Sequence, residues 1–305
     1  MIILEDLPLE ERKLYLEQMR LKSERDKQTR CNVHGNSGVY EIRQEARLMI
    51  LDKPVTHTGT CTEWKVLFMD NKNIQAGIEV LSEKENMKSQ WYELFGLMKK
   101  LTKPLDRIVF DLEEYGRIKA IANQNEIISK WNEVKQEFTA DPNFAELIKF
   151  GDTDYSGPLH SIWKNIIYQL FFFSTNKFSR KMNEPVVLGD DVLLQSVIFP
   201  ECNFKAKVQD KLVGKSKGLL RFEQNTAGGT PDLRQIKRLY KQKYNPFIKQ
   251  NTGSGSDVDY SISYNSDYGV YEDTGKLLHC KTVFEEWVNE NLYYKSEIEI
   301  KLKEQ

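Results

Sequence analysis

Hydrophobic and polar residues along this chain follow two different periods. At the end of the segment Leu292–Leu302, Ile298, Ile300 and Leu302 alternate with Glu297, Glu299 and Lys301, which predicts a strand with one face on a core and one face in water. Over Met87–Lys100 the apolar side chains instead recur at helical intervals, which predicts an amphipathic helix. Both periods recur along the chain, so the sequence predicts an α+β protein.

The same order of elements is predicted twice, as a hairpin, a helix and a second hairpin. The first set covers Thr58–Leu81, Met87–Lys100 and Leu105–Ala122. The second set covers Phe204–Glu223 with a turn at Gly214, Asp232–Tyr244, and Val258–Glu272. We interpret this order as two lobes of curved antiparallel sheet with packed helices, related by an internal duplication. The alternative is one continuous, strongly curved sheet with helices on one face.

These elements divide the chain into three predicted segments. Residues 1–38 hold a helix over Pro8–Lys27 and a linker. Residues 39–174 form the first lobe, which ends in a buried helix over Leu159–Phe173, and residues 175–305 form the second lobe. The sparse apolar positions of Pro8–Lys27 suit a solvated surface helix, which the pattern favours, or a helix that meets a partner.

Composition and charge narrow the classes of partner. The chain has 44 basic and 45 acidic side chains and a formal net charge of −1, so no global field attracts nucleic acid or anionic lipid. A local patch of basic residues is still compatible with this composition. The first residues lack the apolar run of a secretion signal, and the longest apolar stretch, Ile162–Phe173, is too short to cross a bilayer. We expect a cytoplasmic protein without membrane insertion, whose four cysteines are free thiols.

Candidate catalytic groups do not converge in the sequence. His279 precedes Cys280 on a predicted strand, where the two side chains face opposite sides and form no nucleophile–base pair. His160 follows a Gly-Pro turn and is expected on the surface, with no partner identifiable. We therefore predict no catalytic residue.

Acidic residues also do not form a recognisable catalytic or metal-binding site in the sequence. Three adjacent pairs lie at predicted turns or edges, where solvated carboxylates are expected: Glu113–Glu114, Asp190–Asp191 and Glu285–Glu286. Asp152 and Asp154, followed by Gly157, resemble the start of a calcium loop but lack its later ligands. We predict no cofactor.

One set of cysteines and histidines has the spacing of zinc ligands. Two residues separate Cys31 from His34, and three separate His57 from Cys61. In an extended strand His57 and Cys61 would lie about 13 Å apart, so a zinc site would require a bulge or tight turn at Gly59. We favour the other interpretation, which is a buried thiol at Cys61, surface histidines and no metal.

The segment around residue 230 carries the clearest candidate for a binding surface. The loop Asn225–Asp232 precedes a predicted helix, where backbone N–H groups could cradle an anion. The helix interleaves basic and aromatic side chains, and the candidate binding residues are Arg234, Lys237, Arg238, Lys241, Tyr240 and Tyr244. The alternative, which the near-zero net charge favours, is a lysine-rich face that only keeps the protein soluble.

A binding role is the first functional hypothesis, because no polar site converges. We expect a non-enzymatic adaptor, chaperone or assembly factor that grips a protein or peptide in a bacterial multiprotein machine, such as a secretion or contractile apparatus. Its contact elements would be Pro8–Lys27, with Leu14 and Met19, and the closing strand Leu292–Leu302. Two alternatives stay open: an enzyme that binds phosphate or nucleic acid through residues 225–244, and a carrier of a small apolar ligand in a half-barrel.

The adaptor hypothesis leads to a first prediction. Deleting residues 1–30 is expected to leave a folded protein that has lost its partner, because the sparse apolar positions of this segment contribute little to a core. Circular dichroism measures the fold, and affinity purification at low and moderate salt measures the partner. If the truncated chain unfolds, the helix belongs to the core and the hypothesis fails.

Overall fold

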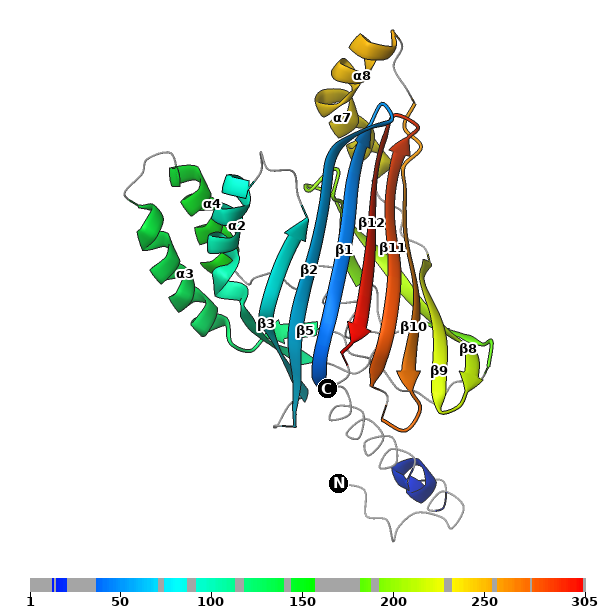
Figure 1. Cartoon of the computed structure of the whole chain (residues 1–305). Coiled ribbons are helices and arrows are strands. Elements are labelled where there is room, and N and C mark those ends of the chain that lie inside the picture. The colour runs from blue at the N-terminus through cyan, green and yellow to red at the C-terminus, as the bar shows by residue number, and fades with distance from the viewer. Residues whose placement is uncertain are drawn as a thin grey trace.

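The structure, a computed structural model, shows one large sheet with helices around it (Figure 1). The described residues are 13, 15–20, 37–70, 74–86, 92–112, 118–139, 144–156, 182–187, 192–227, 232–253, 257–274 and 276–303. Residues 15–20 are helical, as predicted, and Met19 is half exposed. Leu14, the predicted buried helix Leu159–Phe173 and the predicted boundary at residue 174 lie outside the described residues.

All strand pairings described in the sheet are antiparallel. The strands are β1 (Gly38–Ile50), β2 (Lys53–Asp70), β3 (Ile74–Asn86), β4 (Arg107–Leu112), β5 (Ile118–Ile121), β6 (Pro185–Val187), β7 (Val192–Gln195), β8 (Asn203–Ser216), β9 (Leu219–Ala227), β10 (Ser261–Tyr271), β11 (Leu277–Asn289) and β12 (Leu292–Leu302). The helices are α2 (Tyr92–Thr102), α3 (Gln124–Phe138), α4 (Ala145–Ser156), α7 (Leu233–Lys243) and α8 (Asn245–Thr252), with a 3-10 turn, η3 (Lys103–Leu105). The spatial order of strands is β5-β4-β3-β2-β1-β12-β11-β10-β9-β8-β6, and β7 also pairs with β8.

The first and last strands of the sheet in chain order meet in its middle. β1 pairs with β12 in unbroken register from Tyr40–Leu302 to Ile50–Leu292. One core cluster joins residues from both predicted lobes, such as Ile108 on β4 and Phe222 on β9. The mixed helix–strand class and the large antiparallel sheet are therefore confirmed. Two separate lobes and an internal duplication are not, because the two halves share one continuous sheet and one core cluster.

Alternation along the strands gives the sheet one buried face and one solvent face. On β8, every second side chain from Phe204 to Leu212 is buried. Lys217 and Gly218, which join β8 to β9, have positive φ angles of 49° and 76°, as a tight hairpin turn requires. The sequence predicts this turn at Gly214, which instead lies within β8 at a shift in register.

Two other predictions about strands need correction. The hairpin predicted over Val258–Glu272 is one strand, β10, which pairs with β9 on one side and β11 on the other. Residues Asn265–Asp267 have turn-forming side chains, but pairing on both sides overrides that local preference. The closing strand Leu292–Leu302 is β12, whose backbone pairs with β1 and β11, so it offers no free edge to a partner.

Helix α4 contains Asp152 and Asp154, whose spacing in the sequence resembles the start of a calcium loop. A Cβ on Gly151 would overlap the ring of Trp131 on α3, so the two helices approach closely there. Trp131 Nε1 donates to Asp152 Oδ1 at 2.8 Å, and Lys135 Nζ lies 2.9 Å from the same oxygen. The hydrogen bond from Trp131, with that from Lys135, lowers the pKa of Asp152. Asp152 therefore joins two helices and does not begin a calcium loop.

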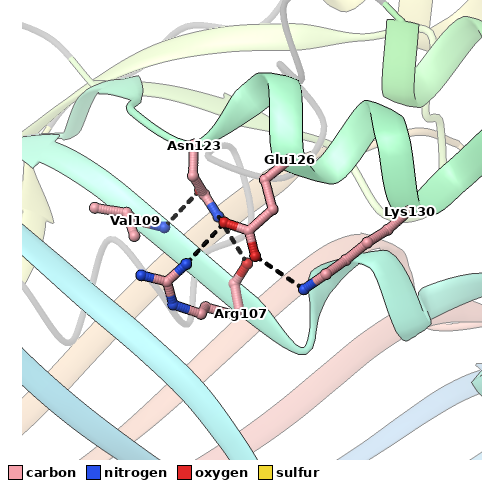
Figure 2. A network of polar contacts seen from close by, with 5 residues as sticks. All are labelled: Arg107, Val109, Asn123, Glu126 and Lys130. Atoms are coloured by element: carbon pink, nitrogen blue, oxygen red, sulfur yellow. Dashed lines mark hydrogen bonds and ion pairs between the residues drawn. The ribbon is translucent and has the colours of Figure 1, made fainter.

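A polar network fixes the start of α3 beside β4 (Figure 2). Asn123 Nδ2 donates to the carbonyl of Arg107 at 3.1 Å and to the carboxylate of Glu126 at 3.2 Å, while its Oδ1 accepts from Val109 N at 2.8 Å. Glu126 also pairs with Arg107 at 2.7 Å and with Lys130 at 3.0 Å. Each of these contacts links strand and helix or stabilises the first turns of α3, so we assign the network to holding α3 in place.

The close approach of α3 and α4 can be tested at Gly151. Gly151→Ala is expected to lower the free energy of unfolding by about 1–3 kcal/mol, because the new methyl group must displace the Trp131 ring. Gly96→Ala in α2 is the matched control: nothing lies within 4 Å of its added Cβ, and alanine favours a helix by up to about 1 kcal/mol. Urea unfolding of both variants measures the difference. A stabilising effect at Gly151 would contradict the packing described.

Candidate functional site

Helices α7 and α8 stand at the end of the sheet where the β1–β2 and β11–β12 turns lie (Figure 1). α7 starts at Asp232, whose Oδ1 accepts the backbone N–H groups of Arg234 at 3.0 Å and Gln235 at 3.3 Å. α8 has Pro246 in its first turn and ends at Gly253, which adopts a left-handed conformation with φ 77°. We call these two helices the tip.

The inner side of the tip packs on a second core cluster, distinct from the one under the centre of the sheet. Its members come from the tip, from the segment before β8 and from the ends of β10, β11 and β12: Ile198, Phe199, Cys202, Ile236, Leu239, Tyr240, Ile248, Tyr260, Val288 and Leu292. Leu48, Ile50 and Leu51, at the end of β1, pack against it. The tip is thus attached to the central strands through buried apolar contacts.

The outer side of the tip is cationic. Successive residues of a helix are rotated by about 100°, which puts one set of exposed side chains of α7 in a single arc opposite its buried residues. We define the cationic face as the exposed basic residues of that arc together with the exposed lysine of α8: Arg234, Lys237, Arg238, Lys241 and Lys249. None of these five side chains has an acidic partner among the described residues.

Some cations elsewhere on the described surface are neutralised by an acidic neighbour, while others, such as Lys205, Lys207 and Lys281, are exposed without an ion pair. On the solvent face of the central strands, Lys295 lies 3.3 Å from Glu285, and ion pairs of the same kind recur across the sheet: Arg43–Glu41, Arg47–Glu45, Lys65–Glu79, Arg221–Asp267, Lys301–Glu299 and Lys303–Glu63. The cationic face is therefore a local concentration of uncompensated positive charge on a chain whose net charge is −1.

A buried carboxylate lies beneath the tip. Glu286 of β11 is fully buried, and its Oε2 accepts the backbone N–H groups of Val197 at 2.7 Å and Ile198 at 3.2 Å. Its Oε1 accepts the hydroxyl of Tyr260 at 2.9 Å and that of Ser196. Burial raises the pKa of Glu286, although all four hydrogen bonds act in the opposite direction.

The segment held by Glu286 in turn supports α7. Phe199 packs against Tyr244 and Tyr260, with ring centroids 5.8 and 6.4 Å apart. The hydroxyl of Tyr244 donates to the carbonyl of Ile198 at 3.4 Å. Lys243, in the last turn of α7, pairs with Glu201. Glu286 therefore fixes the short segment on which the tip rests, which is a structural role.

The structure brings together the basic residues predicted from the sequence and separates the aromatic ones from them. Arg234, Lys237, Arg238 and Lys241 share the cationic face. Tyr240 is only 1% exposed and belongs to the second core cluster, so its prediction as a binding residue is wrong. Tyr244 is half-buried between α7 and the segment beneath it and also serves packing.

The anion cradle predicted at Asn225–Asp232 lies partly outside the described residues. Asn225 to Ala227 belong to β9, and residues 228–231 lie outside the described part of the chain. At the helix start, the carboxylate of Asp232 itself occupies the backbone N–H groups that an anion would use. Positive side chains, and not helix-start amides, therefore make up the candidate site.

The predicted metal ligands are not assembled among the described residues. Cys31 and His34 lie outside them. His57 and Cys61 both lie on β2, opposite Arg47 and Arg43, and the pairing runs through Gly59 without the bulge that a zinc site would require. No group of three or more metal-ligating side chains occurs in the described ranges.

Sequence reasoning missed Glu286, because it placed Glu285–Glu286 at an edge in water. On β11 the buried side chains alternate with exposed ones, from Cys280 through Phe284 to Glu286. The period of two along this strand is the signal that identifies Glu286 as inward-facing, and Glu285 as its exposed neighbour.

Comparison with known proteins yields a structural likeness but no family. No family model matches the chain, and no curated protein matches its sequence. A solved structure of lipovitellin is similar to 88% of this chain, with a TM-score of 0.48 and 9% sequence identity. This chain spans 25% of the length of that lipovitellin chain. Among the described residues, no helix is long and apolar enough to cross a membrane.

The role of Glu286 can be tested by substitution. Glu286→Gln is expected to cost about 1 kcal/mol, because the amide oxygen can accept from Val197 and Ile198 while the amide N–H groups donate to the hydroxyl oxygens of Ser196 and Tyr260. Glu286→Ala leaves these donors buried without a partner and is expected to cost about 3 kcal/mol or more. Urea unfolding measures both.

The pH dependence has a definite sign. Because the pKa of Glu286 is raised in the folded protein, its contribution to stability is fully present below the ordinary pKa of 4.5 and is lost as the pH rises through the raised value. The stability of the wild type relative to Glu286→Gln should therefore decrease as the pH rises above 4.5. Glu285→Gln is the control, since Glu285 is exposed and should change stability by no more than about 0.5 kcal/mol. A relative stability that increases with pH would contradict the assignment.

Proposed function

We propose that this chain is a binding protein that holds an anionic partner on the cationic face of α7 and α8. The observation that carries the proposal is the cluster of five exposed cations without acidic partners on two neighbouring helices. Unpaired cations keep their full field, and neighbouring cations repel one another until an anion binds. A partner with several negative charges would relieve that repulsion.

The contacts that hold the tip on the sheet support binding by a preformed surface. Both helices are capped at defined residues, and their inner sides pack on a buried core cluster. The Glu286 network fixes the segment beneath them. A rigid support lets several cations act on one partner together, without the entropy cost of first ordering the helices.

The finer expectations stay predictions within this proposal. The adaptor, chaperone or assembly-factor role predicted from the sequence is one way of using such a surface, and stoichiometric capture of an acidic protein that survives moderate salt would establish it. A cytoplasmic location is also part of the proposal, because Cys61, Cys202 and Cys280 are free thiols, as is usual in a reducing compartment.

Charge reversal tests the proposal with inorganic polyphosphate as the probe. The double variant Lys237→Glu/Lys241→Glu is expected to bind polyphosphate at least about tenfold more weakly, because each cation near an anionic surface contributes about 1 kcal/mol and reversal adds repulsion. Binding of the wild type should weaken steeply with salt. Fluorescence anisotropy of a labelled polyphosphate measures both effects.

The matched control changes the same charge on other helices. Lys100 on α2 and Lys149 on α4 are exposed helix lysines away from the tip, so Lys100→Glu/Lys149→Glu has the same net charge as the tip variant. It should retain most of the affinity. If both double variants lose affinity equally, net charge alone determines binding and the proposed site is wrong.

A further inference from the structure

The tip exposes apolar side chains as well as cations. Leu233, in the first turn of α7, is 47% exposed, and Phe247 of α8 is 53% exposed. Leu233 lies at the edge of the arc that holds Lys237 and Lys241, whereas Phe247 lies about 200° around α8 from Lys249, with the buried Ile248 between them. Isolated exposed apolar side chains are common on protein surfaces, so Leu233 and Phe247 indicate a binding surface only in combination with neighbouring features.

A second apolar group lies on the solvent face of the sheet, near the turns at the same end. Trp287, Tyr293, Met49 and Pro54 occupy directly opposite positions on β11, β12, β1 and β2. Trp287 is 39% exposed and stacks on Tyr293, with ring centroids 5.1 Å apart. Val55, the next residue along β2, is 56% exposed. We call these five residues the apolar rim.

The cationic face and the apolar rim lie at one end of the molecule. The tip packs on the strand ends that carry the rim, through Val288 and Leu292 on the inner face of β11 and β12. Figure 1 places α7 and α8 at the same end of the sheet as the β1–β2 and β11–β12 turns. Trp and Tyr side chains, together with Lys and Arg, are the residues that proteins place at the boundary between lipid headgroups and acyl chains.

We infer that the anionic partner is a lipid bilayer that contains anionic headgroups, to which the chain binds peripherally through the cationic face and Phe247, with the apolar rim at the same end of the sheet. This inference rests on the proposed function, since it names the partner of the same surface. The charge complements an anionic leaflet, and exposed aromatic side chains add an apolar contribution that a nucleic acid backbone or a soluble polyphosphate cannot use.

Binding of this kind requires no spanning segment. The cations of α7 would lie at the headgroups, and the Phe247 ring would enter the boundary with the acyl chains. The attraction of the leaflet for cations falls off within a Debye length, so the cations must be at the contact surface, where an exposed helix face puts them. Both contributions are needed, because neither the few apolar side chains nor the cations alone give tight attachment.

Vesicle sedimentation tests the inference on the full chain. The wild type is expected to bind vesicles of phosphatidylcholine mixed with phosphatidylserine, and not vesicles of phosphatidylcholine alone. Phe247→Ser should weaken partitioning by about tenfold, the factor expected when one buried aromatic side chain is lost from an apolar contact. Leu67→Ser is the control, because Leu67 is 45% exposed on β2 near the opposite end of the sheet, and it should bind like the wild type.

The outcomes separate this inference from the proposed function. Binding to polyphosphate without binding to the mixed vesicles would overturn the lipid partner and leave the proposed anionic site intact. Vesicle binding that is equal for Phe247→Ser and Leu67→Ser would also overturn it, since the apolar contact would then contribute nothing. Failure to bind both polyphosphate and vesicles would overturn the proposed function as well. Circular dichroism of each variant confirms that the comparison is made between folded proteins.

Discussion

The pairing of β1 with β12 is the constraint on which the rest of the structure depends. These two strands lie near opposite ends of the chain, yet they pair in one register from Tyr40–Leu302 to Ile50–Leu292. The pairing joins β2–β5 on one side to β8–β11 on the other, and so gives the sheet one continuous buried face. Closing so long a loop costs entropy, which only the sum of many ladder and core contacts can offset.

The position of the candidate site depends on this pairing of β1 with β12. The second core cluster combines the ends of β1, β11 and β12 with the inner sides of α7 and α8. Glu286 adds a polar attachment between β11 and the segment before β8. In the sheet, β11 and β8 are separated by β9 and β10. Burying a carboxylate costs several kcal/mol, and four hydrogen bonds offset part of that cost here, since the pKa of Glu286 stays raised. A buried acid that is fully hydrogen-bonded therefore specifies where this segment, and with it the tip, must lie.

The sequence predicts local structure well and long-range structure poorly, for a physical reason. Periodicity is a local property, and it correctly identifies β2, β12 and α7, as well as the basic face of α7. Register is not a local property. A buried polar row crosses four strands, where the following residues lie directly opposite one another: Asp210, Gln224, Ser266 and Thr282. The hydroxyl of Tyr268 donates to Asp210, and that of Tyr264 donates to Gln224. Nothing in the spacing of these residues along the chain brings them together. Tyr240 was misjudged for the same reason, since only the packing of α7 on the strand ends shows which of its faces is buried.

Strand direction explains why charge and apolar surface gather at one end. In a sheet of consecutive antiparallel strands, the connections alternate between its two ends. The β1–β2 and β11–β12 connections therefore lie at the same end as the β9–β10 connection, which contains α7 and α8. The exposed strand termini beside these turns carry the apolar rim, whereas ion pairs neutralise many cations along the middle of the solvent face. A chain of almost zero net charge can therefore present a positive field at one end, because the topology puts the basic residues of α7 there.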